Sequence, residues 1–315
     1  MMIARALLLV AFFVLPAFCE FLTDAPASIP ADEGVWLDMY SGREMDFVSV
    51  MDDLQTADVV YLGESHDSLV HRRIHEIMIG RLCDAGLRLV LVMEQIERAS
   101  QGELDEYNSG RISFEEFSQK TAWGQSWSNW AEYRTIMEKV RLCGGAVAAG
   151  NAPAPVISKV SRTGIGSLDE KERATLPAAM DFNSPAQEKL LDRFFEVHSF
   201  VGPERKRFMF EAQASRDEAI AETAAGFLGQ GPSAGGRRIV VVLAGSMHVS
   251  HGLGVPDRLR RRAGAVRDRI ILISGAPDAG RTVKSMARDV VITHDDFRAA
   301  GRPAGDYIYI IRTKE

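Results

Sequence analysis

Acidic residues and histidines that could hold a metal ion or transfer protons are concentrated in a few short segments of the chain. Five of the seven histidines lie within two of these segments, Glu64–His75 and Gly245–His251. Neutral imidazoles next to carboxylates suit a divalent metal, a haem iron or general acid–base catalysis. We therefore predict one functional crevice, which is built from four side chains: Glu64, His66, Glu94 and His248.

The other residues in these segments have simpler explanations. His75 and His251 are typical of structural histidines, partly exposed on a helix and on a loop, and His294 stands alone in the sequence. Glu64 and Glu94 each follow an apolar run, so they could instead cap a helix N-terminus, where a negative charge is favourable. Only a convergence of all four predicted side chains would favour a functional site over these explanations.

The elements that must position these residues can be read from the hydrophobic pattern. Short apolar runs rich in β-branched residues alternate with longer amphipathic stretches. The predicted strands are 57–64, 87–93, 146–149, 238–244 and 269–274, and the predicted helices are 68–83, 97–107, 130–143 and 203–228. Nearly continuous apolar strands separated by helices indicate an α/β fold, with a mainly parallel sheet and helices on both faces. The region 155–235 contains no convincing strand and is predicted as a helical excursion between sheet strands.

This fold class explains why the four side chains should meet. Glu64 and His66 follow the first predicted strand, Glu94 follows the second, and His248 follows the strand 238–244. Ligands of open α/β sheets bind outside the carboxyl ends of the strands. We therefore expect the crevice at that edge of the sheet.

Composition excludes several classes of protein. The chain has 315 residues, a hydrophobic content of 46% and a formal net charge of −6, which is typical of a globular protein and disfavours nucleic acid as a partner. The three cysteines lack the spacing of a structural zinc site. The glycine-rich stretches match no phosphate-binding motif, so a nucleotide site is not expected.

The first residues predict export from the cytoplasm. Arg5 precedes the unbroken apolar run 7–15, which is too short to cross a bilayer and is typical of a secretory signal. We assign residues 1–19 to the signal, 20–34 to a linker and 35–315 to a single domain. Cleavage before Glu20 is favoured, and acylation of Cys19 is the alternative, in which case the protein would be a lipoprotein anchored to a membrane.

Two cysteines occupy similar positions at the ends of predicted helices. Cys83 and Cys143 each precede a strand, and each is followed by glycine within three residues. Adjacent strands would bring them to the same edge of the sheet, where an oxidising compartment could pair them. Packed helices are separated by 8–10 Å, however, and a disulfide needs Cα atoms within about 7 Å. We therefore expect free thiols, with a disulfide as the alternative.

Five motifs in order resemble the ChaN family of haem-binding, iron-regulated bacterial proteins, within the Tiki/TraB/erythromycin-esterase superfamily. The motifs lie between about Asp58 and Leu259 and are Leu62-Gly63-Glu64-Ser65-His66-Asp67 with His71, Val92-Met93-Glu94-Gln95, Ala149-Gly150-Asn151-Ala152-Pro153, Ala212-Gln213 with Arg216-Asp217, and Ala244-Gly245-Ser246-Met247-His248-Val249 with Gly254-Val255-Pro256 and Arg258-Leu259. The resemblance implies an α/β fold with a parallel sheet, export to the cell envelope, and a role in haem or iron acquisition. Arg72 and Ala154 depart from the family pattern, which often has histidine and arginine there.

The resemblance also implies haem as the cofactor. A porphyrin needs an apolar slot, an axial tyrosine or histidine, and polar groups for its propionates. His71, His198 and Tyr133 are the candidate haem-binding residues, and His198 lies among phenylalanines and basic residues of the helical excursion. Tyr133 would also fit a core position.

Haem-uptake components of the envelope and a second copy of the chain are the expected protein partners. The alternative function is a metal-dependent hydrolase, a protease or esterase, in which the Glu/His crevice holds a divalent metal ion.

Overall fold

The structure is a computed structural model of the chain and describes residues 34–198, 202–228, 237–274 and 301–311, with the backbone alone for 193–198. The predicted signal, Cys19 and His294 lie outside the described residues, as does the linker up to residue 33. Gly34, the last residue assigned to the linker, begins the first strand.

One sheet contains the eight strands of the described residues, in the order β2-β1-β8-β7-β3-β6-β4-β5. The strands are β1 (Gly34–Asp38), β2 (Glu44–Met45), β3 (Val59–Glu64), β4 (Arg88–Glu97), β5 (Ala146–Asn151), β6 (Arg238–Gly245), β7 (Asp268–Ser274) and β8 (Tyr307–Ile311). The six strands from β8 to β5 are parallel to one another, and β1 and β2 add an antiparallel edge. The predicted mainly parallel sheet is confirmed, but β1, β2 and β8 were not predicted.

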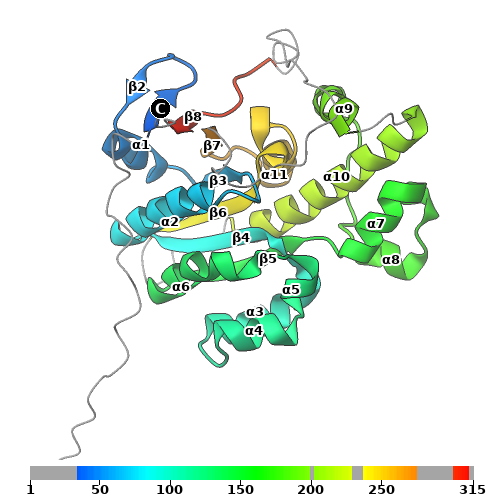
Figure 1. Cartoon of the computed structure of the whole chain (residues 1–315), viewed down its shortest axis with the longest axis horizontal. Helices are drawn as coiled ribbons and strands as arrows, with labels where there is room; N and C mark the ends of the chain where they lie inside the picture. The colour runs from blue at the N-terminus through cyan, green and yellow to red at the C-terminus, as the bar shows by residue number, and fades with distance from the viewer. Residues whose placement is uncertain (1–33, 199–201, 229–236, 275–300, 312–315) are drawn as a thin grey trace, which may run out of the picture.

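Helices cover both faces of this sheet, as predicted (Figure 1). The α-helices are α1 (Phe47–Leu54), α2 (Leu69–Asp84), α3 (Gln101–Asn108), α4 (Phe114–Lys120), α5 (Trp123–Ser126), α6 (Arg134–Leu142), α7 (Ala154–Thr163), α8 (Glu170–Ala174), α9 (Pro185–His198), α10 (Pro203–Ala225) and α11 (Val255–Ala263). The 3₁₀ turns are η1 (Arg98–Ser100), η2 (Trp130–Tyr133), η3 (Ile165–Ser167), η4 (Ser246–His248) and η5 (Ser250–Gly252).

The two faces follow from the alternation of side chains along each strand. Val60 and Leu62 of β3 belong to the larger core, which also contains buried residues of α1, α2 and α6. Val59 and Tyr61 point to the opposite face and pack with buried residues of α10 and α11. The strands are therefore apolar on both sides, which is why they appear as continuous hydrophobic runs in the sequence.

The helical excursion is also present. From residue 154 to 228 the described residues form helices and turns, and none of them form a strand. α10 contacts α7, α9 and α11, and Figure 1 shows α7, α8 and α9 gathered around α10, away from β1 and β2. This places the excursion beside the carboxyl edge of the sheet, where it contributes to the candidate site described below.

Candidate functional site

The carboxyl edge of three neighbouring strands brings the four predicted side chains together. β3 ends at Glu64, β6 ends at Gly245 and leads into the 3₁₀ turn that contains His248, and β4 lies on the other side of β6. Glu94 was predicted to follow its strand but lies inside it, because β4 continues to Glu97. The register between β4 and β5 shifts between Met93 and Glu97, so the strand is irregular where Glu94 leaves it.

His66 lies between carboxylates that come from opposite faces of the sheet. Glu64 shares its face with Leu62 of the larger core, and Glu94 shares its face with Val92 of the other core. The Nδ1 atom of His66 donates to Glu64 Oε1 over 2.9 Å, and its Nε2 atom lies 3.8 Å from Glu94 Oε2. Burial alone would lower the pKa of His66, but the hydrogen bond to Glu64 and the charge of Glu94 raise it above its usual value.

Gly245 allows the His66 imidazole to pack closely against the backbone where β6 ends. A Cβ atom at Gly245 would lie 2.7 Å from His66 Nε2, which is closer than real contacts allow. The His66 side chain is also 41% exposed, whereas Glu64 and Glu94 are buried. The imidazole is therefore held at Nδ1 by a buried carboxylate and faces a backbone without a side chain at Nε2.

His248 is a buried cation between two carboxylates. Its Nε2 atom lies 3.1 Å from Glu94 Oε1, and its Nδ1 atom donates to Asp217 Oδ1 over 2.5 Å. Burial acts to lower the pKa of His248, but Glu94 and Asp217 raise it to about 10. Burial acts to raise the pKa of Glu94, but His248 holds it well below its usual range. At neutral pH the group is therefore carboxylate, imidazolium and carboxylate.

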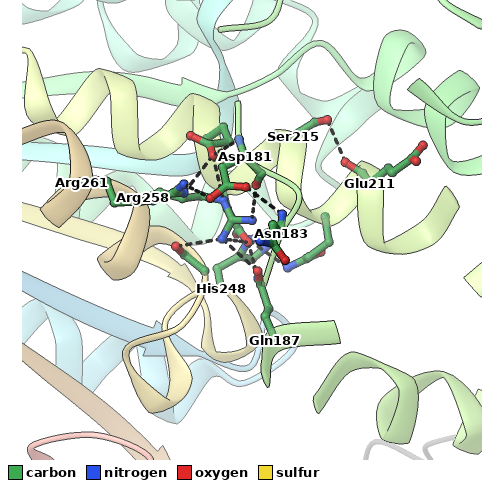
Figure 2. Close-up of polar contacts among 12 residues, drawn as sticks. Asp181, Asn183, Gln187, Glu211, Ser215, His248, Arg258 and Arg261 are labelled. Carbon is green, nitrogen blue, oxygen red and sulfur yellow. Dashed lines mark hydrogen bonds and ion pairs between the residues drawn. The ribbon is translucent and has the colours of Figure 1, made fainter. Parts of the chain in front are cut away.

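The excursion extends this charged group. Figure 2 shows Gln187, Arg258 and His248, which come from α9, α11 and η4, pointing toward one another. Gln187 donates to Asp217 Oδ2 over 2.6 Å and accepts from Arg258 Nη1 over 2.9 Å. The fully buried Arg258 also forms an ion pair with Glu218 at 3.3 Å. Each buried charge in this group thus has a partner of opposite sign, which burial requires.

Sequence reasoning did not assign roles to Asp217, Gln187 or Arg258. Asp217 and Arg258 lie within the motifs that carry the family resemblance, so a signal was present. Gln187 lies outside those motifs, and only the packing of α9 against α10 and α11 brings it to Asp217.

The structure places two of the three candidate haem-binding side chains, those of Tyr133 and His71. Tyr133 is fully buried and donates to Glu64 Oε1 over 2.5 Å; burial and the Glu64 charge raise its pKa well above the usual value. His71 is buried, and its Nδ1 atom accepts from the Ser65 N–H over 3.0 Å. Both side chains thus form hydrogen bonds within the protein, to Glu64 and Ser65, and their role in haem binding stays a prediction. His198 ends α9, and its side chain lies outside the described residues.

The two histidines predicted to be structural are buried rather than partly exposed. His75 is enclosed in α2, and its ring nitrogens have no hydrogen-bond partner. His251 has a φ of 59° and its Nδ1 atom lies 3.1 Å from the carbonyl oxygen of Arg302. The partial exposure predicted for both is therefore wrong, because residues distant in the sequence cover them.

The geometry does not form a metal-ligand set. Among the described residues, no group of three or more His, Cys, Asp or Glu side chains is arranged to hold a metal ion. Glu64 Oε1 accepts hydrogen bonds from His66, Gln95 and Tyr133. Glu94 forms an ion pair with His248 and accepts a hydrogen bond from the Gly245 N–H. The predicted set Glu64, His66, Glu94 and His248 does converge, but as a network of hydrogen bonds and ion pairs.

The side chains near His66 include the types of group that a haem requires. Leu69 and Val70, which follow the His66 loop at the start of α2, are 52% and 36% exposed, although large apolar side chains are usually buried. The Trp127 ring meets the His66 ring edge-on at 4.9 Å. Exposed apolar side chains beside a carboxylate-held imidazole supply both an apolar contact and an iron ligand, which a porphyrin requires.

The prediction that Cys83 and Cys143 are free thiols is wrong. Cys83 and Cys143 form a disulfide with Cα atoms 5.7 Å apart. Both residues lie at C-terminal ends of helices, and α2 and α6 contact each other directly. The helices converge at this end, so the spacing of parallel packed helices was the wrong guide.

Comparisons with known proteins agree with these observations. The sequence model described as "Haem-binding uptake, Tiki superfamily, ChaN" matches residues 50–259. Among solved structures, ChaN of Campylobacter jejuni, described as binding haem cofacially, aligns with a TM-score of 0.65 and 18% identity, covering 91% of this chain and 100% of that chain. No curated protein matches the sequence.

Two further solved structures are less similar. A mutant of the erythromycin esterase EreC in its open conformation has a TM-score of 0.41 and 11% identity, covering 76% of this chain and 77% of that chain. The type III effector HopBA1 has a TM-score of 0.39 and 14% identity, covering 71% and 81%.

Proposed function

Because the chain belongs to the ChaN family of haem-binding uptake proteins, in the Tiki superfamily, we propose that it binds haem at the carboxyl edge of the sheet, with His66 as the axial ligand. The observation that carries this proposal is the His66 side chain, which is 41% exposed while its Nδ1 atom donates to buried Glu64. Histidines that ligate metals usually donate their other nitrogen to a carboxylate, which orients the ring and raises its basicity.

The residues around His66 would contact the porphyrin or orient the imidazole. Leu69, Val70 and Trp127 offer the apolar contact surface for the porphyrin. Glu64 holds the His66 proton at Nδ1, and Gln95 and Tyr133 fix that carboxylate in turn. His66 would hold the haem through a bond to the iron, and the group would supply no further chemistry for uptake.

Titration of haemin into the apo protein tests the site. We expect the wild-type protein to give a Soret difference spectrum distinct from free haemin, and His66→Ala to change its position and weaken binding. Glu64→Gln should weaken binding by about 10- to 100-fold, the usual effect of losing an outer-shell partner. His251→Asn is the matched control, because asparagine tolerates the positive φ at this buried histidine. A wild-type spectrum identical to free haemin would falsify haem binding, and an unchanged spectrum in His66→Ala would exclude His66 as the ligand.

The hydrolase alternative has less support. A catalytic metal needs several ligands and an open position, and among the described residues no group of three or more His, Cys, Asp or Glu side chains is arranged to hold one. Elemental analysis of the purified protein provides the test. Stoichiometric divalent metal without haem would favour the hydrolase.

We also propose that the protein is exported to the periplasm or cell envelope. The apolar run 7–15 supports this proposal, and so does the Cys83–Cys143 disulfide, because disulfides persist mainly in oxidising compartments. Among the described residues, no helix is long and apolar enough to cross a membrane. The intact mass of the native protein separates cleavage before Glu20 from acylation of Cys19, and retention of Met1 would contradict export.

The partners proposed for an exported protein of this kind are haem-uptake components of the envelope and a second copy of the chain. Cross-linking in cells and sedimentation of the haem-loaded protein test these two proposals separately.

A further inference from the structure

Arg72 is a buried charged side chain beside the candidate site that has no role in the network of Glu94 and His248. It lies in the first turn of α2 and is only 3% exposed. Burying a guanidinium costs free energy unless hydrogen bonds and ion pairs compensate for its lost hydration. A buried arginine is therefore expected where it fixes a local conformation. Its contacts show which conformation that is.

Arg72 joins the His66 loop to the segment that precedes α6. Its Nη1 atom donates to the carbonyl oxygen of His66 over 2.7 Å, and its Nη2 atom forms an ion pair with Glu132. The guanidinium carbon also lies 5.5 Å from the centre of the Tyr133 ring, within the range of a cation–π contact. A single planar side chain therefore holds both segments at once.

The same carbonyl oxygen has a second donor. Asn129 Nδ2 donates to it over 2.5 Å, and Asn129 lies between Trp127, which packs edge-on against the His66 ring, and Tyr133, which donates to Glu64. The backbone of residue 66 is thus held by α2 on one side and by residues 127–133 on the other. The orientation of the His66 ring depends on both sides.

We propose that Arg72 is a positioning residue for His66, which fixes the imidazole for iron by joining the His66 loop to residues 127–133. This inference rests on the proposed haem function, and it adds a residue that the resemblance did not assign, because the family often has histidine at this position. Arginine suits the role because its planar fork donates to two acceptors at once, whereas lysine offers a single point charge.

The test compares Arg72→Met, Asn129→Ala and Arg72→Lys with the wild type. Arg72→Met removes both polar contacts of the guanidinium, and Asn129→Ala removes the second donor without burying a new group. Arg269→Met is the matched control, because Arg269 is partly buried and forms an ion pair with Asp53. Arg269 lies at the start of β7, at the edge of the sheet opposite to the candidate site. We expect Arg72→Met to weaken haemin binding about tenfold and to broaden the ferric electron paramagnetic resonance signal into mixed spin states. Arg269→Met should leave both unchanged.

A double-mutant cycle with His66→Ala shows whether Arg72 acts through His66. We expect Arg72→Met to have no further effect on haemin affinity once His66 is alanine. An equal loss in both backgrounds, or an unchanged spectrum in Arg72→Met and Asn129→Ala, would overturn the proposal.

Hydrogen exchange of the apo protein separates this proposal from the haem function. We expect faster exchange of the amides at residues 65–67 in Arg72→Met and Asn129→Ala, with Arg72→Lys between these variants and the wild type. Unchanged exchange there would contradict the positioning role. If wild-type protein failed to bind haemin, the haem function would be rejected while the exchange data still decided whether Arg72 fixes the loop. If Arg72→Met failed to fold, haemin binding and hydrogen exchange would both be measured on Asn129→Ala.

Discussion

The two histidines of the crevice show how position within one edge of a sheet gives the same side chain different properties. His66 is half-exposed and has one buried carboxylate at hydrogen-bond distance, whereas His248 is buried between two. His66 is therefore available to a ligand. His248 acts as a fixed positive charge that keeps the pKa of buried Glu94 well below its usual range.

Replacement of His248 by glutamine should strongly destabilise the protein. The change leaves Glu94 and Asp217 buried without their cation, and breaking a buried ion pair costs about 3–5 kcal/mol. The pKa of His248 is raised in the folded state, so the stability that its charge contributes depends on pH. This contribution is fully present below the pKa of histidine in the unfolded chain, about 6.5, and is lost as the pH rises toward about 10. Urea unfolding at pH 6 and pH 9 checks this. An equal difference between wild type and His248→Gln at both values would contradict it, and His251→Asn serves as the control.

His75 should make the protein sensitive to acid. Burial lowers the pKa of His75 well below its usual value, so on acidification protons bind the unfolded chain before they bind His75 in the folded protein. Lowering the pH from 7.5 to 5.5 should therefore reduce the free energy of unfolding by about 1.4 kcal/mol through His75. His75→Leu, similar in volume, should remove that part of the pH dependence. Parallel stability–pH curves for the two proteins would show that His75 does not titrate as inferred.

At the scale of elements, the exposed edge of the sheet at β5 is protected by side chains of α3. Asn108 donates to the Val147 carbonyl over 2.8 Å and accepts from the Val147 N–H over 2.9 Å, as a neighbouring strand would. Gln101 accepts from the Ala149 N–H over 2.8 Å. Open strand edges promote pairing between molecules, so these two side chains block a route to aggregation.

Removal of this protection should reduce both stability and solubility. Asn108→Ala leaves a buried donor and acceptor of β5 without partners, which costs about 1–3 kcal/mol for an unsatisfied group. We expect a lower denaturation midpoint and faster aggregation by light scattering, with a larger effect in the double variant with Gln101→Ala. The exposed Gln125→Ala is the control. Stability and aggregation equal to those of the wild type would show that α3 does not protect the edge.

At the scale of the whole molecule, one covalent bond joins helices whose opposite ends hold the site. α2 begins beside His66 and has Cys83 in its last turn, while α6 begins after Tyr133 and is followed by Cys143. The disulfide therefore closes a loop that contains β4 and the contacts that Glu94, Trp127 and Asn129 make with His66. The bond fixes one end of both helices, and Arg72 joins the other.

Loss of the disulfide should destabilise the whole domain. The cysteines are separated by 60 residues, for which the chain-entropy argument gives about 4 kcal/mol. Cys83→Ser and Cys143→Ser should each lose this amount, and the double variant should lose no more than either alone. Alkylation of the denatured, unreduced protein should label neither cysteine. Labelling of both would show that the bond does not form in solution.

The sequence determined the parallel core of the sheet and the residues at its carboxyl edge. Strands buried on both faces have continuous apolar sequences, so β3, β4, β6 and β7 were recognisable, and the histidines that follow them marked the crevice. β8 and β1 were not predicted. β8 is a run of five apolar residues without a distinctive period, and β1 has only three large apolar residues. Their pairing joins segments far apart in the sequence.

Only the tertiary structure decided what each residue of the crevice does. The sequence placed Glu64, His66, Glu94 and His248 together, but the ion pairs to Asp217 and the exposure of His66 depend on α10 and on the packing of residues 127–133. Tyr133 and His71 had the right chemistry for haem, yet burial directs both toward the His66 loop. Residue type sets what a side chain can do. Its neighbours, which come from segments far apart in the sequence, set its charge and exposure, and no local pattern records them.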